Sequence, residues 1–224
     1  MKPLRFIHIS KTGGQTIAKV ARDQAQIEWG MYDKQYKPGN IKSRELNCRF
    51  RRGSDQSSVF GKVLSNVSCH ILLSNIQHYE TIDKYDWFMV VRNPYDRFIS
   101  LYNWYIMRTN EKIGMNEYLQ REFQYICIQK NCIGCHFTEQ YRYLDPHCHI
   151  HVLHYENLEE EFNLLMKEYG HNIVLNIKCN VSNKIASLED LTLETIETIN
   201  KIYEKDFTTF HYEMRHSIFQ REES

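Results

Sequence analysis

The sequence has no surplus of charge of either sign. Among 224 residues, Lys and Arg together number 28, and Asp and Glu together also number 28, so the formal net charge is zero. Proteins that bind nucleic acid through bulk electrostatics usually carry a strong positive surplus. The balance argues against a nucleic-acid partner, and any anion site must come from charges that are placed locally.

Long apolar runs are missing as well. No stretch of about 18 apolar residues occurs, so the sequence predicts no membrane-spanning helix. The first ten residues, MKPLRFIHIS, lack the apolar core of a signal peptide and are typical of a β-strand. The sequence as it stands therefore predicts a cytoplasmic protein, and a Golgi lumen location is expected only if an anchor has been truncated.

The cysteine pattern gives no clear disulfide framework. The seven cysteines are an odd number without a secretory signal, which favours free thiols. One segment, Cys132-Ile-Gly-Cys135-His136, matches the c-type haem pattern, but that attachment needs export, so we interpret the match as chance. A disulfide between Cys132 and Cys135 is one alternative. A second is a zinc site, for which the candidate ligands are Cys127, Cys132, Cys135 and Cys148.

Internal repeats and low-complexity segments are absent too, and 224 residues suit one compact domain. Apolar, β-prone segments alternate with amphipathic ones. This order predicts a single P-loop-like α/β domain over residues 1–224, with a central parallel sheet flanked by helices. The expected strands span residues 4–9, 70–76, 87–91 and 149–154. The expected helices span residues 15–26, 156–169 and 188–207, with another beginning after Asn93. On the last helix, the expected buried face consists of Leu193, Ile196, Ile199, Ile202 and Tyr203.

The first motif lies between the first expected strand and helix. It reads Ser10-Lys11-Thr12-Gly13-Gly14-Gln15-Thr16. Glycines let the backbone approach an anion closely, and the start of the following helix directs N–H groups toward it. Lys11 adds a positive charge, and Thr12 and Thr16 add hydroxyl donors. The loop lacks the Walker A pattern and an obvious magnesium ligand, and the alternative is an ordinary strand–helix turn.

The second motif follows the apolar run at residues 87–91 and reads Arg92-Asn93-Pro94-Tyr95-Asp96-Arg97-Phe98-Ile99-Ser100. Asn93 is expected to cap a helix whose first residue is Pro94. Arg92 ends a strand, where ligands of open α/β sheets bind. Arg97 and Ser100 are three residues apart on one helix face. Two guanidinium groups and a hydroxyl suit a phosphate, whereas the alternatives are surface ion pairs and a helix-face hydroxyl.

Together the two motifs resemble those of PAPS-dependent sulfotransferases (PAPS is 3′-phosphoadenosine-5′-phosphosulfate), particularly the carbohydrate branch with its Golgi-type and bacterial members. That family has a lysine-bearing K-T-G-G loop after its first strand and a later R-[ND]-P-x-x-R-x-x-S segment. Weaker similarity covers His154–Leu158 and residues 180–212. The resemblance implies PAPS as co-substrate, the bisphosphate PAP as product, and no required metal. It also implies that Lys11–Thr16 holds the 5′-phosphosulfate and that Arg92 and Ser100 hold the 3′-phosphate.

The reaction that this resemblance implies is an in-line displacement at sulfur. Lys11 is the candidate that stabilises charge on the leaving oxygen. The attacking hydroxyl benefits from a general base, usually His or Glu. The family's spacing before Arg92 favours His70, whereas His78 follows an expected strand, and Glu80 is a third candidate. The sequence leaves the base open.

The acceptor is open as well. A carbohydrate hydroxyl is favoured by the resemblance, and a protein tyrosine or a small molecule also fits. Tyr102-Asn103-Trp104-Tyr105 could stack on a sugar or an aromatic ring, although core packing is the commoner role of such residues. Two other functions remain as alternatives. One is a P-loop nucleotide kinase or phosphotransferase, and the other is a catalytically inactive nucleotide-binding module.

Overall fold

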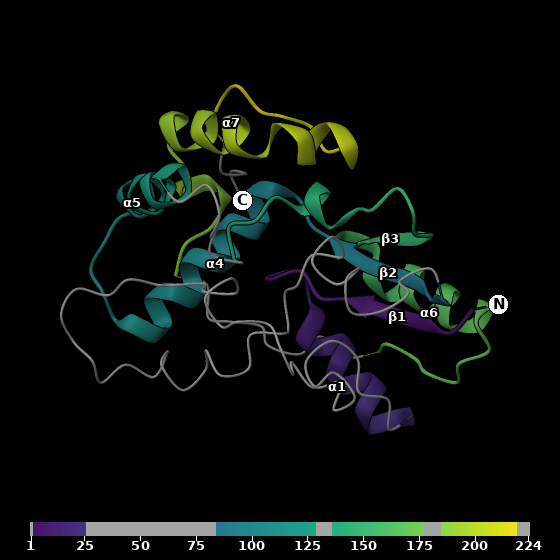
Figure 1. Ribbon diagram of the computed structural model, residues 1–224. Coiled ribbons are helices and arrows are strands. Elements are labelled where there is room, and N and C mark those ends of the chain that lie inside the picture. Colours follow the sequence, from purple (N-terminus) through teal and green to yellow (C-terminus); the bar gives the residue numbers. More distant parts are fainter. Residues whose placement is uncertain (1, 26–83, 129–135, 177–184, 219–224) are drawn as a thin grey trace.

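The computed structural model describes residues 2–25, 84–128, 136–176 and 185–218. Within these ranges, three parallel strands form a sheet in the order β1-β2-β3 (Figure 1). They are β1 (Leu4–Ile7), β2 (Asp86–Val91) and β3 (Ile150–His154). The register aligns Leu4 with Asp86, and Trp87 with Ile150. The predicted parallel sheet is confirmed, while the strand expected at residues 70–76 lies outside the described residues.

Helices flank this sheet, as predicted. The α-helices are α1 (Gly14–Ala25), α4 (Pro94–Thr109), α5 (Met115–Ile128), α6 (Leu158–Glu168) and α7 (Leu193–Thr209). Short 3₁₀ turns are η3 (Gln140–Tyr143), η4 (Tyr155–Asn157) and η5 (Leu188–Asp190).

The central strand β2 is buried on both sides, as its unbroken apolar sequence predicts. On one face it packs with α1 and α6, through residues such as Ile17, Phe88 and Phe162. On the other face Trp87, Met89 and Val91 pack against η3 and Phe210, which follows α7. The two sequence motifs follow the carboxyl ends of β1 and β2, so both lie at the same edge of the sheet (Figure 1).

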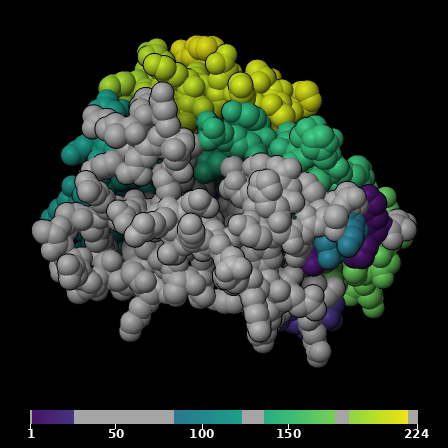
Figure 2. Space-filling model, in the orientation of Figure 1, coloured from purple at the N-terminus to yellow at the C-terminus, as the bar shows by residue number. Residues whose placement is uncertain are grey.

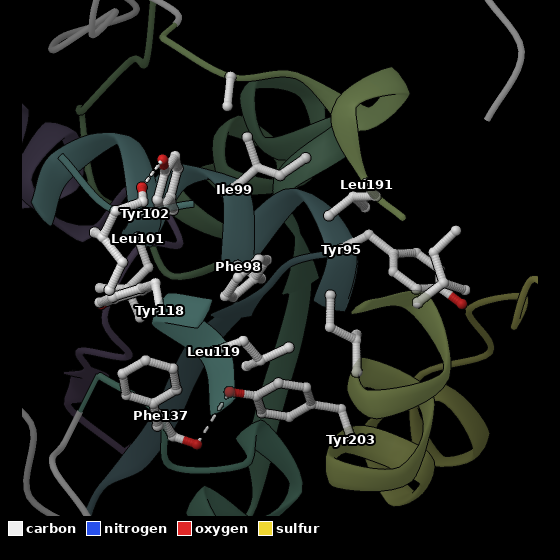
Figure 3. Packing of buried hydrophobic residues seen from close by; sticks show 14 of the residues in the cluster. Tyr95, Phe98, Ile99, Leu101, Tyr102, Tyr118, Leu119, Phe137, Leu191 and Tyr203 are labelled. Atoms are coloured by element: carbon white, nitrogen blue, oxygen red, sulfur yellow. Dashed lines mark hydrogen bonds between the residues drawn. The ribbon is translucent and has the colours of Figure 1, made fainter. Parts of the chain in front are cut away.

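A second core joins α4, α5 and α7 beside the sheet (Figure 3). Its members include Phe98 on α4, Leu119 on α5 and Ile199 on α7, all nearly or fully buried. Tyr203 also belongs to this core, and its hydroxyl donates to the carbonyl oxygen of Phe137 at 3.2 Å. The core thus ties α7 to the chain segment that precedes η3.

Several expected boundaries differ from the structure for local reasons. The first strand ends at Ile7 rather than Ile9, because the Thr12 hydroxyl donates to the Ile9 carbonyl at 2.9 Å and turns the chain. The helix expected from residue 188 is divided, because Thr192 caps a new helix by accepting from the Thr195 N–H. Leu193 therefore lies in the first turn of α7 and is 44% exposed, so its expected burial is wrong.

Candidate functional site

The loop after β1 adopts a backbone that its sequence explains. Lys11 has a φ of 67° and Gly13 a φ of 84°, both in the left-handed region. Glycine takes that region without strain, whereas a lysine there is uncommon, and residues held in such regions cluster at functional sites. Gly14 has a different need: an added Cβ would lie 2.1 Å from the His8 ring. The two glycines therefore permit, respectively, the turn and the close packing of α1 on β1.

The polar side chains of this loop differ in burial, because Thr12 and Thr16 are buried whereas Gln15 is exposed. Thr12 is fully buried and its hydroxyl donates to Ile9, so it supports the turn. Gln15 is exposed at the start of α1, and Thr16 is 7% exposed. The N–H groups of a helix's first turn have no partners within the helix, which makes this terminus suitable for an anion. The structure places the loop as the sequence predicted, between β1 and α1.

Lys11 stands in a positive environment. Burial, together with the charges of Arg92 and Arg108, lowers its pKa to about 8. Its Nζ lies 5.6 Å from the centroid of the Trp104 ring, and the Arg108 guanidinium carbon lies 5.0 Å from that same centroid. Like charges close together in a partly buried place favour a bound polyanion, which would relieve their repulsion.

The three strand ends converge on Arg92. Its Nη1 donates to the Lys11 carbonyl oxygen at 3.4 Å, and its guanidinium lies 4.3 Å from the centroid of the Tyr155 ring. Tyr155 follows β3 and also faces Gly13, since an added Cβ there would lie 3.1 Å from its ring. The Arg92 Nε is buried with no hydrogen-bond partner among the described residues. A donor held this way fits an anionic ligand, because a phosphate oxygen would satisfy it.

The backbone at Arg92 is fixed by two side chains that the sequence analysis missed. Gln140 is fully buried; its Oε1 accepts from the Arg92 N–H and its Nε2 donates to the Arg92 carbonyl, both at 2.9 Å. Glu156 accepts from the Asn93 N–H at 2.9 Å. Asn93 in turn caps α4 by accepting from Tyr95 N–H at 3.0 Å, with Pro94 in the first position, so the predicted cap is confirmed.

Arg97 and Ser100 differ in their surroundings. Ser100 is half-buried on α4, whereas Arg97 is only 3% exposed. The Arg97 guanidinium donates to main-chain carbonyls, from Nε to Ser10 at 3.2 Å and from Nη2 to Thr138 at 2.8 Å and His136 at 3.1 Å. The predicted phosphate clamp thus has Arg92 and Ser100 partly accessible, while Arg97 is engaged with the main chain behind them.

Two aromatic rings lie against each other near Lys11, and only one of them, Trp104, was singled out from the sequence as a candidate for stacking. The rings of Trp104 and His136 are stacked, with centroids 5.1 Å apart and planes 19° from parallel. Trp104 lies one turn after Ser100 on α4, and His136 precedes η3. The Tyr-Asn-Trp-Tyr stretch was the sequence signal for Trp104, but nothing local indicated that His136 would stack on it.

Other predicted residues lie outside the described part of the chain. They are the base candidates His70, His78 and Glu80, and the cysteines Cys132 and Cys135, while the Cys127 side chain is likewise not described. The Cys148 side chain is half-buried. Within the described ranges, no group of three or more His, Cys, Asp or Glu residues is arranged to hold a metal ion. In those same ranges, no helix is long and apolar enough to cross a membrane.

Comparison with known proteins agrees with this geometry. The family model described as the sulfotransferase family matches residues 2–213. A search of curated proteins finds no significant match. Among solved structures, a sulfotransferase from Alicyclobacillus acidocaldarius is similar with a TM-score of 0.51 and 13% sequence identity, over 95% of this chain and 97% of that chain. That likeness confirms the predicted fold. Because the family model spans nearly all of the sequence, the chain belongs to the sulfotransferase family.

Proposed function

We propose that this chain transfers a sulfuryl group from PAPS to an acceptor hydroxyl, with residues 1–224 acting as one domain. The observation that carries the proposal is the meeting of Lys11 and Arg92 at the ends of two adjacent strands, where Arg92 Nη1 bonds the Lys11 carbonyl at 3.4 Å. Two cationic side chains beside a helix N-terminus suit a ligand with two separate anionic groups. PAPS has that form, with a 5′-phosphosulfate and a 3′-phosphate.

In this proposal the donor binds along the strand ends. The 5′-phosphosulfate is bound by the loop residues Lys11, Gly13, Gly14, Gln15 and Thr16. Thr12 stabilises the turn through its bond to the Ile9 carbonyl. The 3′-phosphate is held by Arg92 and Ser100. The unsatisfied Arg92 Nε supports this assignment, because a buried guanidinium donor without a partner costs free energy that a phosphate oxygen would recover.

The chemistry is a displacement at sulfur. The acceptor oxygen forms a bond to sulfur while the bond from sulfur to the bridging oxygen of the 5′-phosphate breaks. Negative charge grows on that bridging oxygen, which leaves as part of PAP. A protonated Lys11 placed there stabilises the transition state more than the ground state. This logic requires no metal.

The proton of the acceptor hydroxyl passes to a general base, for which His70, His78 and Glu80 are the candidates. The acceptor itself is proposed to be a carbohydrate hydroxyl, with a tyrosine or a small-molecule hydroxyl as alternatives. The stacked Trp104 and His136 rings beside Lys11 support an acceptor that offers a flat face, since sugars and aromatic groups both stack on such surfaces.

Calorimetric titration with PAP tests the proposal. PAP, AMP and ATP are titrated without added magnesium into the wild type and into Arg92→Ala. We expect PAP to bind more tightly than AMP, because only PAP carries the 3′-phosphate, and we expect Arg92→Ala to remove most of that difference. The matched control is Arg142→Ala, which removes an exposed arginine paired with Glu139.

The outcomes separate the candidate functions. Preference for PAP that is lost in Arg92→Ala supports the sulfotransferase site, and transfer of labelled sulfate from PAPS to a panel of sugars and phenols then identifies the acceptor. Binding of ATP with magnesium and none of PAP would contradict the proposal and favour a phosphotransferase. Tight PAP binding without transfer to any acceptor would favour an inactive binding module.

A further inference from the structure

The chain segment 136–141 is held by its backbone from two sides. On one side the buried Arg97 donates to the carbonyl oxygens of His136 and Thr138. On the other side Tyr203 donates to Phe137 at 3.2 Å (Figure 3), and Asp206 accepts from the N–H groups of residues 140 and 141 at 2.9 and 2.8 Å. The positively charged Arg97 thus bonds carbonyl groups of this segment, while the carboxyl group of Asp206 bonds its N–H groups.

The residues that provide this support are themselves buried. Arg97 is 3% exposed, Tyr203 is 4% exposed and Asp206 is fully buried. Burial raises the pKa of the Asp206 carboxyl, and the positive charge of Arg97 opposes that rise. In the space-filling view, the green-teal segment that precedes β3 lies directly beneath the yellow α7 (Figure 2). Burying a charged group is unfavourable unless the group is well hydrogen-bonded. Arg97 and Asp206 both bond the main chain of this segment, so the groups that satisfy them also fix its position.

The same segment contacts both halves of the candidate donor site. At its start, the His136 carbonyl accepts from the Ser10 hydroxyl at 3.3 Å, and Ser10 directly precedes Lys11. The His136 ring stacks on Trp104, which Lys11 also approaches. At its other end, the Gln140 amide bonds both main-chain groups of Arg92. The start of the segment, which Arg97 bonds, therefore adjoins the Lys11 loop, whereas Gln140 at its other end holds Arg92 and is fixed separately by Asp206.

We propose that Arg97 is a positioning residue that couples the Lys11 loop to the segment 136–141. Its guanidinium spans both elements, with Nε on Ser10 and Nη2 on His136 and Thr138. It acts through these main-chain groups and does not touch the donor. The inference rests on the proposed function, because it assigns Arg97 the task of holding the leaving-group lysine in line with the sulfur.

Direct contact between Arg97 and the 3′-phosphate is the competing role. Two of the three guanidinium nitrogens already donate to carbonyls, so a ligand would reach only Nη1, which is buried with no hydrogen-bond partner among the described residues. The two roles differ in what they do to binding. A ligand of the 3′-phosphate favours PAP over AMP, whereas a positioning residue for the loop affects both equally, because both carry the 5′-phosphate.

The binding test compares PAP and AMP in Arg97→Lys, Arg92→Ala and the wild type. We expect Arg97→Lys to weaken both ligands by a similar factor, about fivefold for a lost buried hydrogen bond, so that their ratio is unchanged. Arg92→Ala should lower the ratio. A ratio that falls in Arg97→Lys as it does in Arg92→Ala would overturn the proposal, and so would unchanged affinity for both ligands.

The coupling is also tested without any ligand, by hydrogen exchange of the full chain. Tyr203→Phe removes only the hydroxyl that bonds Phe137 and leaves Arg97 in place. We expect it to speed amide exchange by about fivefold in residues 136–141 and also in the Lys11 loop, because Arg97 connects them. Tyr105→Phe is the matched control, because it removes a hydroxyl that bonds Glu111 instead. Faster exchange confined to residues 136–141 would overturn the coupling, even if the chain bound no PAP and the proposed function had failed.

Discussion

The side chain of Gln140 bonds both main-chain polar groups of Arg92. The Arg92 N–H donates to Oε1 and the Arg92 carbonyl accepts from Nε2, each at 2.9 Å. This pairing is the one that a neighbouring strand would make, but here a side chain supplies it at the point where β2 ends. The N–H and the carbonyl of Arg92 therefore both have hydrogen-bond partners where the strand ends, and the Arg92 side chain is held beside the Lys11 loop.

Replacing Gln140 with Ala tests this relationship. The change leaves an N–H and a carbonyl of Arg92 without their partners in a buried place, so we expect the free energy of unfolding to fall by about 2 kcal/mol or more. PAP affinity should fall as well, because Arg92 loses its fixed position. Urea denaturation and calorimetry measure the two effects. Gln120→Ala is the control, since Gln120 is exposed and bonds only Glu194 among the described residues; equal losses in both variants would contradict the prediction.

Gly14→Ala should disrupt the loop by steric conflict alone. The new Cβ would lie 2.1 Å from the buried His8 ring, so α1 or the ring must shift. We expect a loss of about 1–3 kcal/mol in the free energy of unfolding, together with weaker PAP binding. Gly114→Ala is a matched control, because nothing lies within 4 Å of its Cβ position. Thermal denaturation compares the pair, and a Gly14→Ala variant as stable as the wild type would show that the loop has more room than the structure gives it.

The local features of the site could be predicted from the sequence. The Asn93 cap and Pro94 start of α4, and the glycine turn after β1, depend on residues next to one another in the chain. The support of Arg92 and the partners of Arg97 could not be predicted. Arg97 bonds carbonyls that lie 39 and 41 residues away, and Gln140 bonds a backbone 48 residues away. Every residue except proline has both main-chain groups, so nothing in the sequence distinguishes the ones that are used.

Asp206→Asn should weaken the support of segment 136–141 from the α7 side. The carboxylate accepts two N–H bonds, from residues 140 and 141, whereas an amide presents only one oxygen and places its NH₂ against the second N–H. We expect the free energy of unfolding at pH 7 to fall by about 1–3 kcal/mol.

The pH dependence gives an independent check on Asp206. Burial raises the pKa of this carboxyl in the folded chain above its unfolded value, so ionising it opposes folding. Its contribution to stability therefore declines as the pH rises from the unfolded value through the raised folded value. Asp206→Asn should remove that decline. Identical pH profiles of denaturation for the variant and the wild type would contradict the assigned shift.

Turnover of PAPS should fall as the pH rises above about 8. Burial and the charges of Arg92 and Arg108 lower the pKa of Lys11 to about 8 in the free protein, and only the protonated form stabilises the leaving oxygen. The pH profile of kcat/KM for PAPS, which reports the free enzyme, should show this alkaline limb. Arg108→Gln should move the limb to higher pH, because it removes a positive charge that disfavours protonation. A limb that does not move would exclude Lys11 as its source.

Lys11→Met should abolish transfer and yet stabilise the fold at neutral pH. Because the pKa of Lys11 is lower in the folded chain than in the unfolded chain, the folded state binds fewer protons between about pH 8 and the ordinary lysine value. The charge therefore opposes folding below pH 8, and this penalty declines as the pH rises through that interval. Removing the charge should add roughly 1–3 kcal/mol at pH 7 to the free energy of unfolding, at the lower end because Lys11 is only partly buried.

Lys19→Met is the control, as Lys19 is exposed and pairs with Asp23. Denaturation of both variants at pH 7 and pH 10 measures the effect; the gain in Lys11→Met should shrink at pH 10, and a loss of stability at pH 7 would mean that the site does not oppose the charge of Lys11.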